Sequence, residues 1–276
     1  MATSTLFAGS LLGRRNRGGM LVGDPRIDLL PDGNAGPRRF KVKAAETETR
    51  RGLVSSLLRA RYAWRGYQAA SLPTDQSVHR FTLAAIEQQS TIGTITVSFD
   101  GAVGLQADET FAAEVAHLRE RGRKLCEFTK LAIDPITGSK RVLAALFHTA
   151  YIVAFRIRKF DTLLIEVNPR HARYYQRMLG FHIISEERMN EAVKAPALLL
   201  GIDFAYIMHK VGEFGGQPER AAEERSLYPF VFGLSEEASI LTRMLARQAM
   251  WDEQNADPQH PPMRPSQFQQ SDLMGL

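Results

Sequence analysis

Residues 166–181 read Glu166-Val-Asn-Pro-Arg-His-Ala-Arg-Tyr-Tyr-Gln-Arg-Met-Leu-Gly-Phe181. The short apolar run that leads into them, Thr162–Val167, predicts a buried strand. Asn168 can cap the start of a helix, Pro169 has the fixed φ angle of a first helical position, and Gly180 can end the helix. The stretch therefore predicts a strand, a capped helix and a glycine turn, which is the local pattern of an α/β protein.

Helix-like and strand-like periodicity extends from this stretch in both directions. Two β-rich runs, His79–Gln88 and Ser90–Phe99, predict a hairpin. After the glycine turn, Phe181–Ser185 and Ala195–Met208 predict two further strands. The remaining predicted elements are helices at Glu48–Tyr67 and Ala107–Arg123, a strand at Leu125–Ile133, and a helix capped by Ser139 that runs to about Lys159. Together they predict an α/β domain over residues 48–211.

Two flanking segments differ from this domain in composition. Residues 1–47 are rich in glycine and proline and have no sustained apolar period, so we expect a flexible arm. The arm is basic, because residues 1–65 contain 13 Lys and Arg against 5 Asp and Glu. Residues 212–276 predict a C-terminal extension with one amphipathic helix near Ser235–Trp251 and a disordered Pro- and Gln-rich tail.

The composition limits the class of protein. With 44% hydrophobic and 24% charged residues in a chain of 276, a sizeable core can be buried, as in soluble globular proteins. The longest apolar run, Val142–Phe155, is shorter than the ~20 residues that cross a bilayer. The apolar patch Leu6–Leu12 precedes its positive charges, the reverse of a secretory signal, and the single Cys126 excludes an intramolecular disulfide. We therefore expect a cytoplasmic protein.

Several kinds of functional motif are absent from the sequence. It has no phosphate-binding glycine loop, no zinc-protease motif and no basic stripe with interleaved aromatic residues. We therefore expect no metal ion and no nucleic-acid partner. His148 lies on an apolar helix and is expected to be a core histidine with its hydrogen bonds satisfied rather than a metal ligand.

Three blocks of sequence resemble a known family. Residues 166–181 are similar to the closing motif of the GNAT acyltransferase superfamily. The blocks Gly104–Arg123 and Cys126–Asp134 narrow the resemblance to the long-chain N-acyl amino acid synthases, which are relatives of the acyl-homoserine lactone autoinducer synthases. The resemblance covers roughly residues 50–211. It implies an α/β, GNAT-like acyltransferase fold in which helices flank a mixed central sheet.

The resemblance implies that a long-chain fatty acyl group moves from acyl carrier protein to the α-amine of an amino acid. An α-amine is largely protonated near pH 7 and only the neutral amine attacks a thioester, so a base is required, and Glu127 is the candidate. Lys130, Arg61 and Tyr67 are candidates for binding the substrate, with Lys130 or Arg61 neutralising its carboxylate. In a regular strand Glu127 and Lys130 point to opposite faces, so a shared site predicts a β-bulge.

The resemblance also implies the donor, acyl-phosphopantetheine on acyl carrier protein rather than acyl-CoA, with no tightly bound cofactor. GNAT enzymes that use CoA hold its diphosphate with a glycine-rich loop at a helix N-terminus, where this chain has only Thr137-Gly138-Ser139-Lys140-Arg141. A pantetheine arm carries a single phosphate, which fits such a reduced loop. The candidate acyl- and pantetheine-binding residues are Leu131, Ala132, Ile133, Ser139, Arg141, Asn168 and Tyr175.

Three further expectations concern the acyl chain, a catalytic acid and the partners. The Val142–Phe155 helix and the Ala195–Leu200 strand are the expected walls of an apolar tunnel. Tyr175 lies five residues before Gly180, whereas the superfamily's usual acid tyrosine lies four residues before that glycine. The resemblance therefore does not carry the role of catalytic acid over to Tyr175. The expected partners are acyl carrier protein and an amino acid, and peripheral membrane association through a lipid product is compatible with them.

Alternative functions remain open at this point. The same fold serves autoinducer-type synthases, CoA-dependent N-acetyltransferases and non-catalytic domains that bind carrier protein or lipid.

Overall fold

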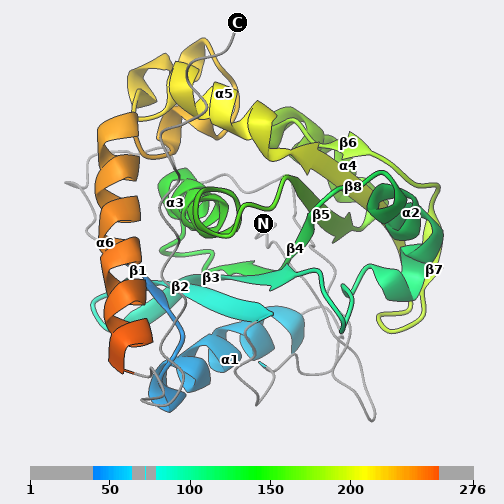
Figure 1. Ribbon diagram of the computed structural model, residues 1–276, viewed down its shortest axis with the longest axis horizontal. Helices are drawn as coiled ribbons and strands as arrows, with labels where there is room; N and C mark the ends of the chain where they lie inside the picture. The colour runs from blue at the N-terminus through cyan, green and yellow to red at the C-terminus, as the bar shows by residue number, and fades with distance from the viewer. Residues whose placement is uncertain (1–39, 64–71, 73–78, 255–276) are drawn as a thin grey trace, which may run out of the picture. The chain divides into compact units, whose positions relative to one another are not determined.

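A mixed sheet organises the part of the chain that the computed structural model describes, residues 40–63, 72 and 79–254 (Figure 1). The strands are β1 (Lys41–Ala44), β2 (Arg80–Glu87), β3 (Ser90–Phe99), β4 (Leu125–Ile133), β5 (Thr162–Val167), β6 (His182–Ile183), β7 (Arg188–Asn190) and β8 (Ala195–Asp203). They lie in the order β1-β2-β3-β4-β5-β8-β6, and β7 pairs with β8. Neighbouring strands are antiparallel except β4 and β5, which are parallel.

Helices cover both faces of the sheet. The α-helices of the described residues are α1 (Glu48–Ala63), α2 (Asp108–Glu120), α3 (Lys140–Tyr151), α4 (Pro169–Leu179), α5 (Phe204–Phe214) and α6 (Leu234–Gln254). Figure 1 shows α1 and α3 on opposite sides of β2 and β3. On the α1 side, Val54 and Phe111 of α1 and α2 join Leu164 of β5 in one buried cluster. On the other side, Phe128 of β4 contacts Phe147 of α3, with ring centroids 5.9 Å apart.

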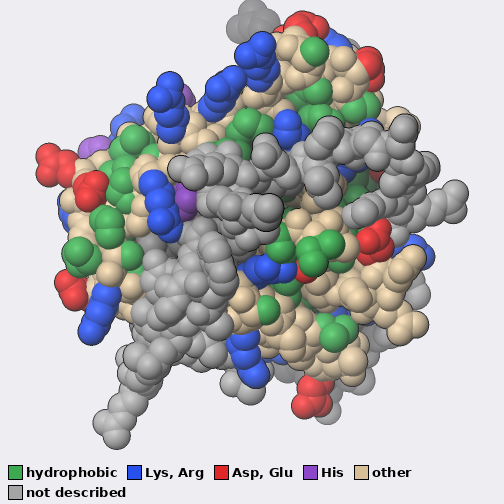
Figure 2. Space-filling view, turned by 180° about the vertical axis from the view of Figure 1, so that it is seen from behind, with side chains coloured by type: hydrophobic (Ala, Val, Ile, Leu, Met, Phe, Trp, Pro, Cys, Tyr) green, Lys and Arg blue, Asp and Glu red, His purple; other side chains and the backbone are tan. Residues whose placement is uncertain are grey.

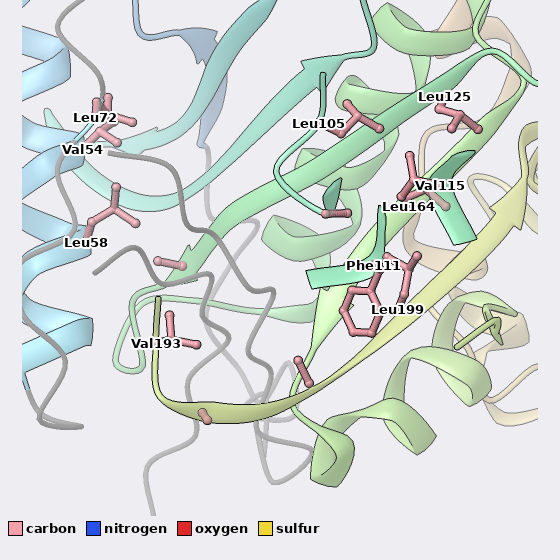
Figure 3. Packing of buried hydrophobic residues seen from close by; sticks show 14 of the residues in the cluster. Val54, Leu58, Leu72, Leu105, Phe111, Val115, Leu125, Leu164, Val193 and Leu199 are labelled. Carbon is pink, nitrogen blue, oxygen red and sulfur yellow. The ribbon is translucent and has the colours of Figure 1, made fainter. Parts of the chain in front are cut away.

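The cluster between the sheet and the helices α1 and α2 stabilises the domain (Figure 3). Each large aliphatic or aromatic side chain that is fully buried contributes about 1.5–3 kcal/mol relative to exposure. The labelled members are Val54, Leu58, Leu72, Leu105, Phe111, Val115, Leu125, Leu164, Val193 and Leu199.

The predicted helix ends are confirmed. Ser139 is the N-cap of α3, and its Oγ accepts a hydrogen bond from the N–H of Val142 at 3.3 Å. Asn168 is the N-cap of α4, and its Oδ1 accepts from the N–H of Arg170 at 3.2 Å. Gly180 ends α4 in the left-handed conformation with φ of 86°. These three residues fix where the chain leaves the sheet and returns to it.

The strand β1 lies inside the segment for which the sequence predicts a flexible arm. Its side chains alternate between exposed and half-buried positions, and its backbone pairs with β2 from Lys41–Ile86 to Ala44–Leu83. The hydrogen bonds of this four-residue strand come from a partner about forty residues away, so its own sequence carries no strong signal for it. Residues 1–39 of the predicted arm lie outside the described residues.

Two apolar runs depart from their predicted lengths. The strand predicted over Ala195–Met208 ends at Asp203, and α5 begins at Phe204. Apolar runs do not by themselves distinguish a strand from a buried helix, and the predicted domain boundary at residue 211 falls within α5. The helix predicted from Ser139 to about Lys159 ends as an α-helix at Tyr151 and continues as a π-helix over Ile152–Ile157.

His148 is a satisfied core histidine, as predicted. Its Nδ1 lies 3.0 Å from the N–H of Phe232 and must accept that bond, so Nε2 carries the proton and donates to Glu237 at 3.1 Å. Glu237 also pairs with Arg156. His148 is 2% exposed, so these bonds lie inside the core. The bond to Glu237 joins α3 to the first turn of α6.

The chain divides into two compact units after Glu237, and α6 crosses the division. The helix predicted near Ser235–Trp251 lies within α6, whereas the predicted tail beyond residue 254 is outside the described residues.

None of the described helices is long and apolar enough to span a bilayer. Figure 2 shows Lys and Arg side chains interspersed with acidic and hydrophobic ones on one face.

Gly180→Ala tests the left-handed end of α4. An added Cβ would lie 2.4 Å from Cε1 of Tyr206, and alanine is strained at φ of 86°, so we expect the free energy of unfolding to fall by about 2 kcal/mol. Gly122→Ala is the matched control, because φ is 72° but no described heavy atom lies within 4 Å of the added Cβ. It should cost about 1 kcal/mol. Urea unfolding measures both, and equal losses would contradict a contribution from Tyr206.

Candidate active site

A fork between β4 and β5 forms the centre of the candidate site. The two strands pair in parallel only from Leu125–Thr162 to Glu127–Leu164. Beyond that point β5 pairs with β8 on its other side, from Thr162 to Val167. The backbone groups of β4 and β5 that face each other beyond Glu127 therefore have no strand partner across the fork, and they can bind an extended ligand.

The predicted β-bulge is present in β4. Thr96 of β3 is opposite Thr129, whereas Thr94 is opposite Ala132, so β4 contains one extra residue between these pairs. Lys130 has φ of 49°, which is unusual for a residue with a side chain. The bulge breaks the regular alternation, and as a result the adjacent residues Thr129 and Lys130 line the same cavity.

Glu127 is the last β4 residue paired with β5, and its carboxyl group is buried. Oε2 accepts hydrogen bonds from the backbone N–H groups of Gln106, at 2.8 Å, and Ala107, at 3.4 Å, immediately before α2. Oε1 has no hydrogen-bond partner among the described residues. Burial, and next the charge of Glu166, raise the pKa of Glu127 to about 8, although the two N–H groups and Arg80 act in the opposite direction. Near neutral pH this carboxyl group can both accept and release a proton.

Polar side chains form two rows across β2, β3 and β4 on the face that carries Glu127. Arg80 is opposite Ser98, which is opposite Glu127, and the Arg80 Nε lies 3.3 Å from the Ser98 Oγ. The second row is Thr82, Thr96 and Thr129, in which the hydroxyl oxygens of Thr82 and Thr96 are 2.8 Å apart.

A cavity of about 190 Å³ lies beside these rows and has room for several water molecules or a small polar ligand. Its lining includes Arg80, Leu105, Gln106, Glu109, Thr129 and Lys130. Glu127 bonds to the backbone of one of these residues, Gln106, and is two positions from another, Thr129. Lys130 therefore lines the cavity, and Glu127 is buried next to it through its bond to Gln106.

Glu166 is a second buried carboxyl group, for which the sequence predicted no role. Its Oε1 accepts from the Nδ2 of Asn190, and its Oε2 has no partner among the described residues. Burial raises the pKa of Glu166 to about 7; the bond from Asn190 lowers it and the charge of Glu109 raises it. The available signal was an acidic residue inside the apolar strand Thr162–Val167, each residue of which is buried.

Arg61 lies at the far end of β4 from Glu127. Its Nη2 pairs with Oδ2 of Asp134 at 2.8 Å. Asp134 follows Glu127 by seven residues of extended chain, which is roughly 20 Å, so the structure does not bring Arg61 beside Glu127. Tyr67, the other residue predicted to bind the substrate, lies outside the described residues.

Asp134 organises the loop between β4 and α3. Its Oδ1 accepts hydrogen bonds from the N–H groups of Ile136 and Thr137, at 2.9 and 3.0 Å, and from the Thr137 hydroxyl. The N–H of Gly138 donates to the Asp134 carbonyl at 2.7 Å. Burial opposes ionisation, but these donors and Arg61 hold the pKa of Asp134 below its usual range. The N–H groups of Ile136 and Thr137 are therefore already bonded to a carboxylate of the chain itself.

The residues predicted to bind the acyl and pantetheine groups are distributed around the fork. Leu131, Ala132 and Ile133 are buried in β4 after the bulge. Ser139 and Asn168 cap the helices that follow β4 and β5, so two helix N-termini lie at the end where these parallel strands diverge. Arg141, the remaining member of the set outside α4, is exposed in the first turn of α3.

Tyr175 is buried in α4. Its ring packs edge-on against Tyr174 and Phe181, and its hydroxyl has no partner among the described residues. Burial, followed by the influence of Tyr174, raises the pKa of Tyr175 well above its usual value. The hydroxyl stays protonated at neutral pH, and the ring packing shows a contribution to the core.

The helix predicted to line an apolar tunnel borders a small apolar void. An apolar void of only about 20 Å³ lies between β4, α3 and α5, and its lining includes Phe128, Phe147, Tyr151, Leu163 and Ile207. This is too small for a fatty acyl chain.

In the described part of the chain, no group of three or more His, Cys, Asp or Glu residues could hold a metal ion.

Comparisons with known proteins identify relatives of the chain. A family profile described as N-acyl amino acid synthase FeeM matches residues 54–203. The solved structure of FeeM, an N-acyl amino acid synthase from uncultured soil microbes, is 25% identical, with a TM-score of 0.55 over 61% of this chain and 94% of that chain. A search of curated proteins finds no significant match. The predicted α/β fold, in which helices flank a mixed sheet, is confirmed, and it is similar to the FeeM structure.

Two other solved structures are similar at lower scores. The aminoglycoside 6'-N-acetyltransferase from Enterococcus faecium is 13% identical, with a TM-score of 0.42 over 60% of this chain and 97% of that chain. The AHL synthase LasI is 10% identical, with a TM-score of 0.40 over 61% of this chain and 91% of that chain.

The raised pKa of Glu127 predicts a pH dependence of stability. Between its ordinary pKa of 4.5 and about 8, the folded protein holds a proton on Glu127 that the unfolded chain has released. The contribution of this residue to stability is therefore complete below pH 4.5 and is lost as the pH rises through 8. Glu127→Gln should reduce the decline by up to about 1.4 kcal/mol per pH unit. Urea unfolding from pH 5 to 8 measures this.

Glu120→Gln is the matched control for that experiment, because it makes the same substitution at an exposed position of α2. An unchanged decline in Glu127→Gln would contradict the burial of an ionisable Glu127.

Proposed function

We propose that this chain, which belongs to the N-acyl amino acid synthase FeeM family and is an acyltransferase, moves a long-chain acyl group from acyl carrier protein to the α-amine of an amino acid. The observation that carries the proposal is the buried carboxyl group of Glu127, with a pKa of about 8, at the apex of the β4–β5 fork. The comparisons place the chain in the family, and its geometry supports the acceptor and the donor.

The acceptor chemistry follows from the pKa of Glu127. An α-amino group has a reference pKa of about 7.7–8.0, so a carboxyl group with a pKa of about 8 can take its proton at little free-energy cost. The neutral amine then attacks the thioester carbon, the C–S bond breaks, and the sulfur leaves as a thiol with the second proton of the nitrogen. The polar rows across β2, β3 and β4 supply hydrogen-bonding groups next to this point.

The fork supports an extended donor arm. A pantetheine arm contains two amide groups, and the unpaired backbone of β4 and β5 beyond Glu127 can bond to them as it would to another strand. The bulge interrupts the regular pairing of β4 with β3 near Glu127, and a backbone N–H in this segment can stabilise the oxyanion formed by attack on the thioester.

The loop at Asp134 favours a carrier-protein donor over acyl-CoA. The diphosphate of CoA would meet a carboxylate whose bonds already occupy the N–H groups of Ile136 and Thr137. A carrier-bound pantetheine arm has one phosphate, and the helix start at Ser139 and the exposed Lys140 and Arg141 can accommodate it.

The acyl chain needs space that the α3 face does not supply in this conformation, because side chains such as Phe128, Phe147 and Tyr151 fill it. A long chain would lie in the fork or displace these side chains. The length of the acyl chain is therefore to be measured on the products of the reaction.

Lipids extracted from cells that express the full chain test the proposed function. We expect mass spectrometry to detect long-chain N-acyl amino acids with the wild type. Glu127→Gln should lower their formation by about 10²- to 10⁴-fold while the protein still folds, because it removes the base. Homoserine lactones, acetylated amines, or no acylated product would each contradict the proposal, and so would undiminished synthesis by Glu127→Gln.

Charge reversal tests the donor. The double substitution Lys140→Glu and Arg141→Glu should raise the apparent KM for acyl carrier protein at least about tenfold, because carrier proteins are acidic, and the effect should weaken as salt increases. Turnover of a small acyl-thioester mimic should change little. Steady-state kinetics with both donors measures this.

Lys41→Glu with Lys43→Glu is the matched control, since it reverses the same charge on exposed side chains of β1 at the edge of the sheet. Equal losses with both donors would indicate a damaged site, and an unchanged KM for the carrier protein would place its docking surface elsewhere.

A further inference from the structure

Glu127 and Glu166 lie on the same face of the sheet, on either side of the fork. Glu127 is opposite Leu164 in the parallel pair, so the two side chains point to one face. Glu166 is two residues further along β5 and returns to that face. The two positions are thus separated by one strand spacing and two strand residues, at the point where β4 and β5 part.

Each of these carboxyl groups is anchored through one oxygen, and its other oxygen has no hydrogen-bond partner among the described residues. Both residues are 0% exposed. The backbone before α2 holds Oε2 of Glu127, and Asn190 holds Oε1 of Glu166. Neither Oε1 of Glu127 nor Oε2 of Glu166 has a partner among the described residues. A buried acceptor without a donor costs about 1–3 kcal/mol, so a ligand that supplies donors to both would relieve two such costs.

The side chain of Asn190 is itself fixed. Its Oδ1 accepts from the N–H groups of Ala192 and Val193, at 2.9 and 3.1 Å. Its Nδ2 is therefore directed at Glu166, and the resulting hydrogen bond holds the Glu166 carboxyl group in one orientation. This arrangement of β7 and β5 is a positioned acceptor rather than a mobile surface carboxylate.

The chemistry of the two available oxygens selects a cationic donor. Charged groups near the pair among the described residues include Glu109 of α2, which raises the pKa of Glu166. They also include Arg80 of β2, which bonds to Ser98 and whose charge lowers the pKa of Glu127. A primary ammonium group has three N–H donors and one positive charge, so it can bond to both carboxyl groups at once. A neutral hydroxyl group supplies one donor and no charge.

We infer that Glu166 is a second substrate-binding residue of this site, and that it holds the α-ammonium group of the acceptor together with Glu127 before the acyl transfer. This inference rests on the proposed function and names a residue that touches the reacting nitrogen. The ammonium gives one proton to Glu127 and becomes an amine. Glu166 then holds the remaining N–H bonds while the nitrogen attacks the thioester carbon. The second proton leaves with the thiol, so amide, thiol and one proton on Glu127 balance the reaction.

Binding of n-butylammonium to the full chain tests the inference without any acyl donor. At pH 8.5 calorimetric titration should show binding of n-butylammonium in preference to 1-butanol. Glu166→Gln should weaken that binding about 10- to 100-fold, because it removes a charged acceptor but keeps an oxygen for Asn190. Glu166→Asp, which retains the charge, should bind more tightly than Glu166→Gln. The control Glu120→Gln should bind as the wild type does.

Kinetics with the amino acid found in the products gives a second readout. Glu166→Gln should raise its KM by a similar factor and leave the affinity for its desamino analogue unchanged, whereas a purely structural role would affect both. Equal binding of n-butylammonium by wild type and Glu166→Gln, or no preference over 1-butanol in the wild type, would overturn the inference. Lipid extracts without N-acyl amino acids would instead overturn the proposed function, and the n-butylammonium result would still stand on its own.

Discussion

β4 and β5 share hydrogen bonds only as far as the pair of Glu127 and Leu164, and the properties of the candidate site depend on their separation beyond that pair. Parallel neighbours that stayed paired would satisfy each other's backbone and leave no room between them. The extra residue at Lys130 and the pairing of β5 with β8 both accommodate the separation. As a consequence, backbone donors and acceptors become available in the interior of the sheet, where water does not compete with a ligand for them.

Burial, hydrogen bonds and neighbouring charges together set the pKa values of the carboxyl groups at the two ends of β4. A carboxyl group inside a sheet is costly to ionise, and Glu127 is compensated only in part by the N–H groups of Gln106 and Ala107. The neighbouring Glu166 adds to the cost. At Asp134, in contrast, loop amides and Arg61 more than offset burial, and the pKa falls. The two ends of β4 therefore have opposite character, with a protonatable group at one end and a fixed negative charge at the other.

Local features of the fold were predictable from the sequence because their causes are local. The caps Ser139 and Asn168 and the turn at Gly180 act on residues a few positions away. The bulge was predicted from a resemblance that assigns Glu127 and Lys130 to one site. Pairings between distant segments were not predictable: Arg61 meets Asp134 across 73 residues, and Glu166 meets Asn190 across 24. These partners depend on the sheet order, which no single segment specifies.

The hydrogen bonds of His148 connect the α/β domain to residues that follow it in the sequence. Its two ring nitrogens are bonded to Phe232 and Glu237, and the hydroxyl of Tyr228 donates to the carbonyl of Leu179 at 2.7 Å. All three partners follow residue 211, where the sequence pattern of the α/β domain ends. A polypeptide that ends at residue 211 would contain each strand of the sheet but lack the hydrogen-bond partners of both His148 nitrogens. The hydrogen-bonded core therefore extends to Glu237, beyond residues 54–203, which the family profile matches.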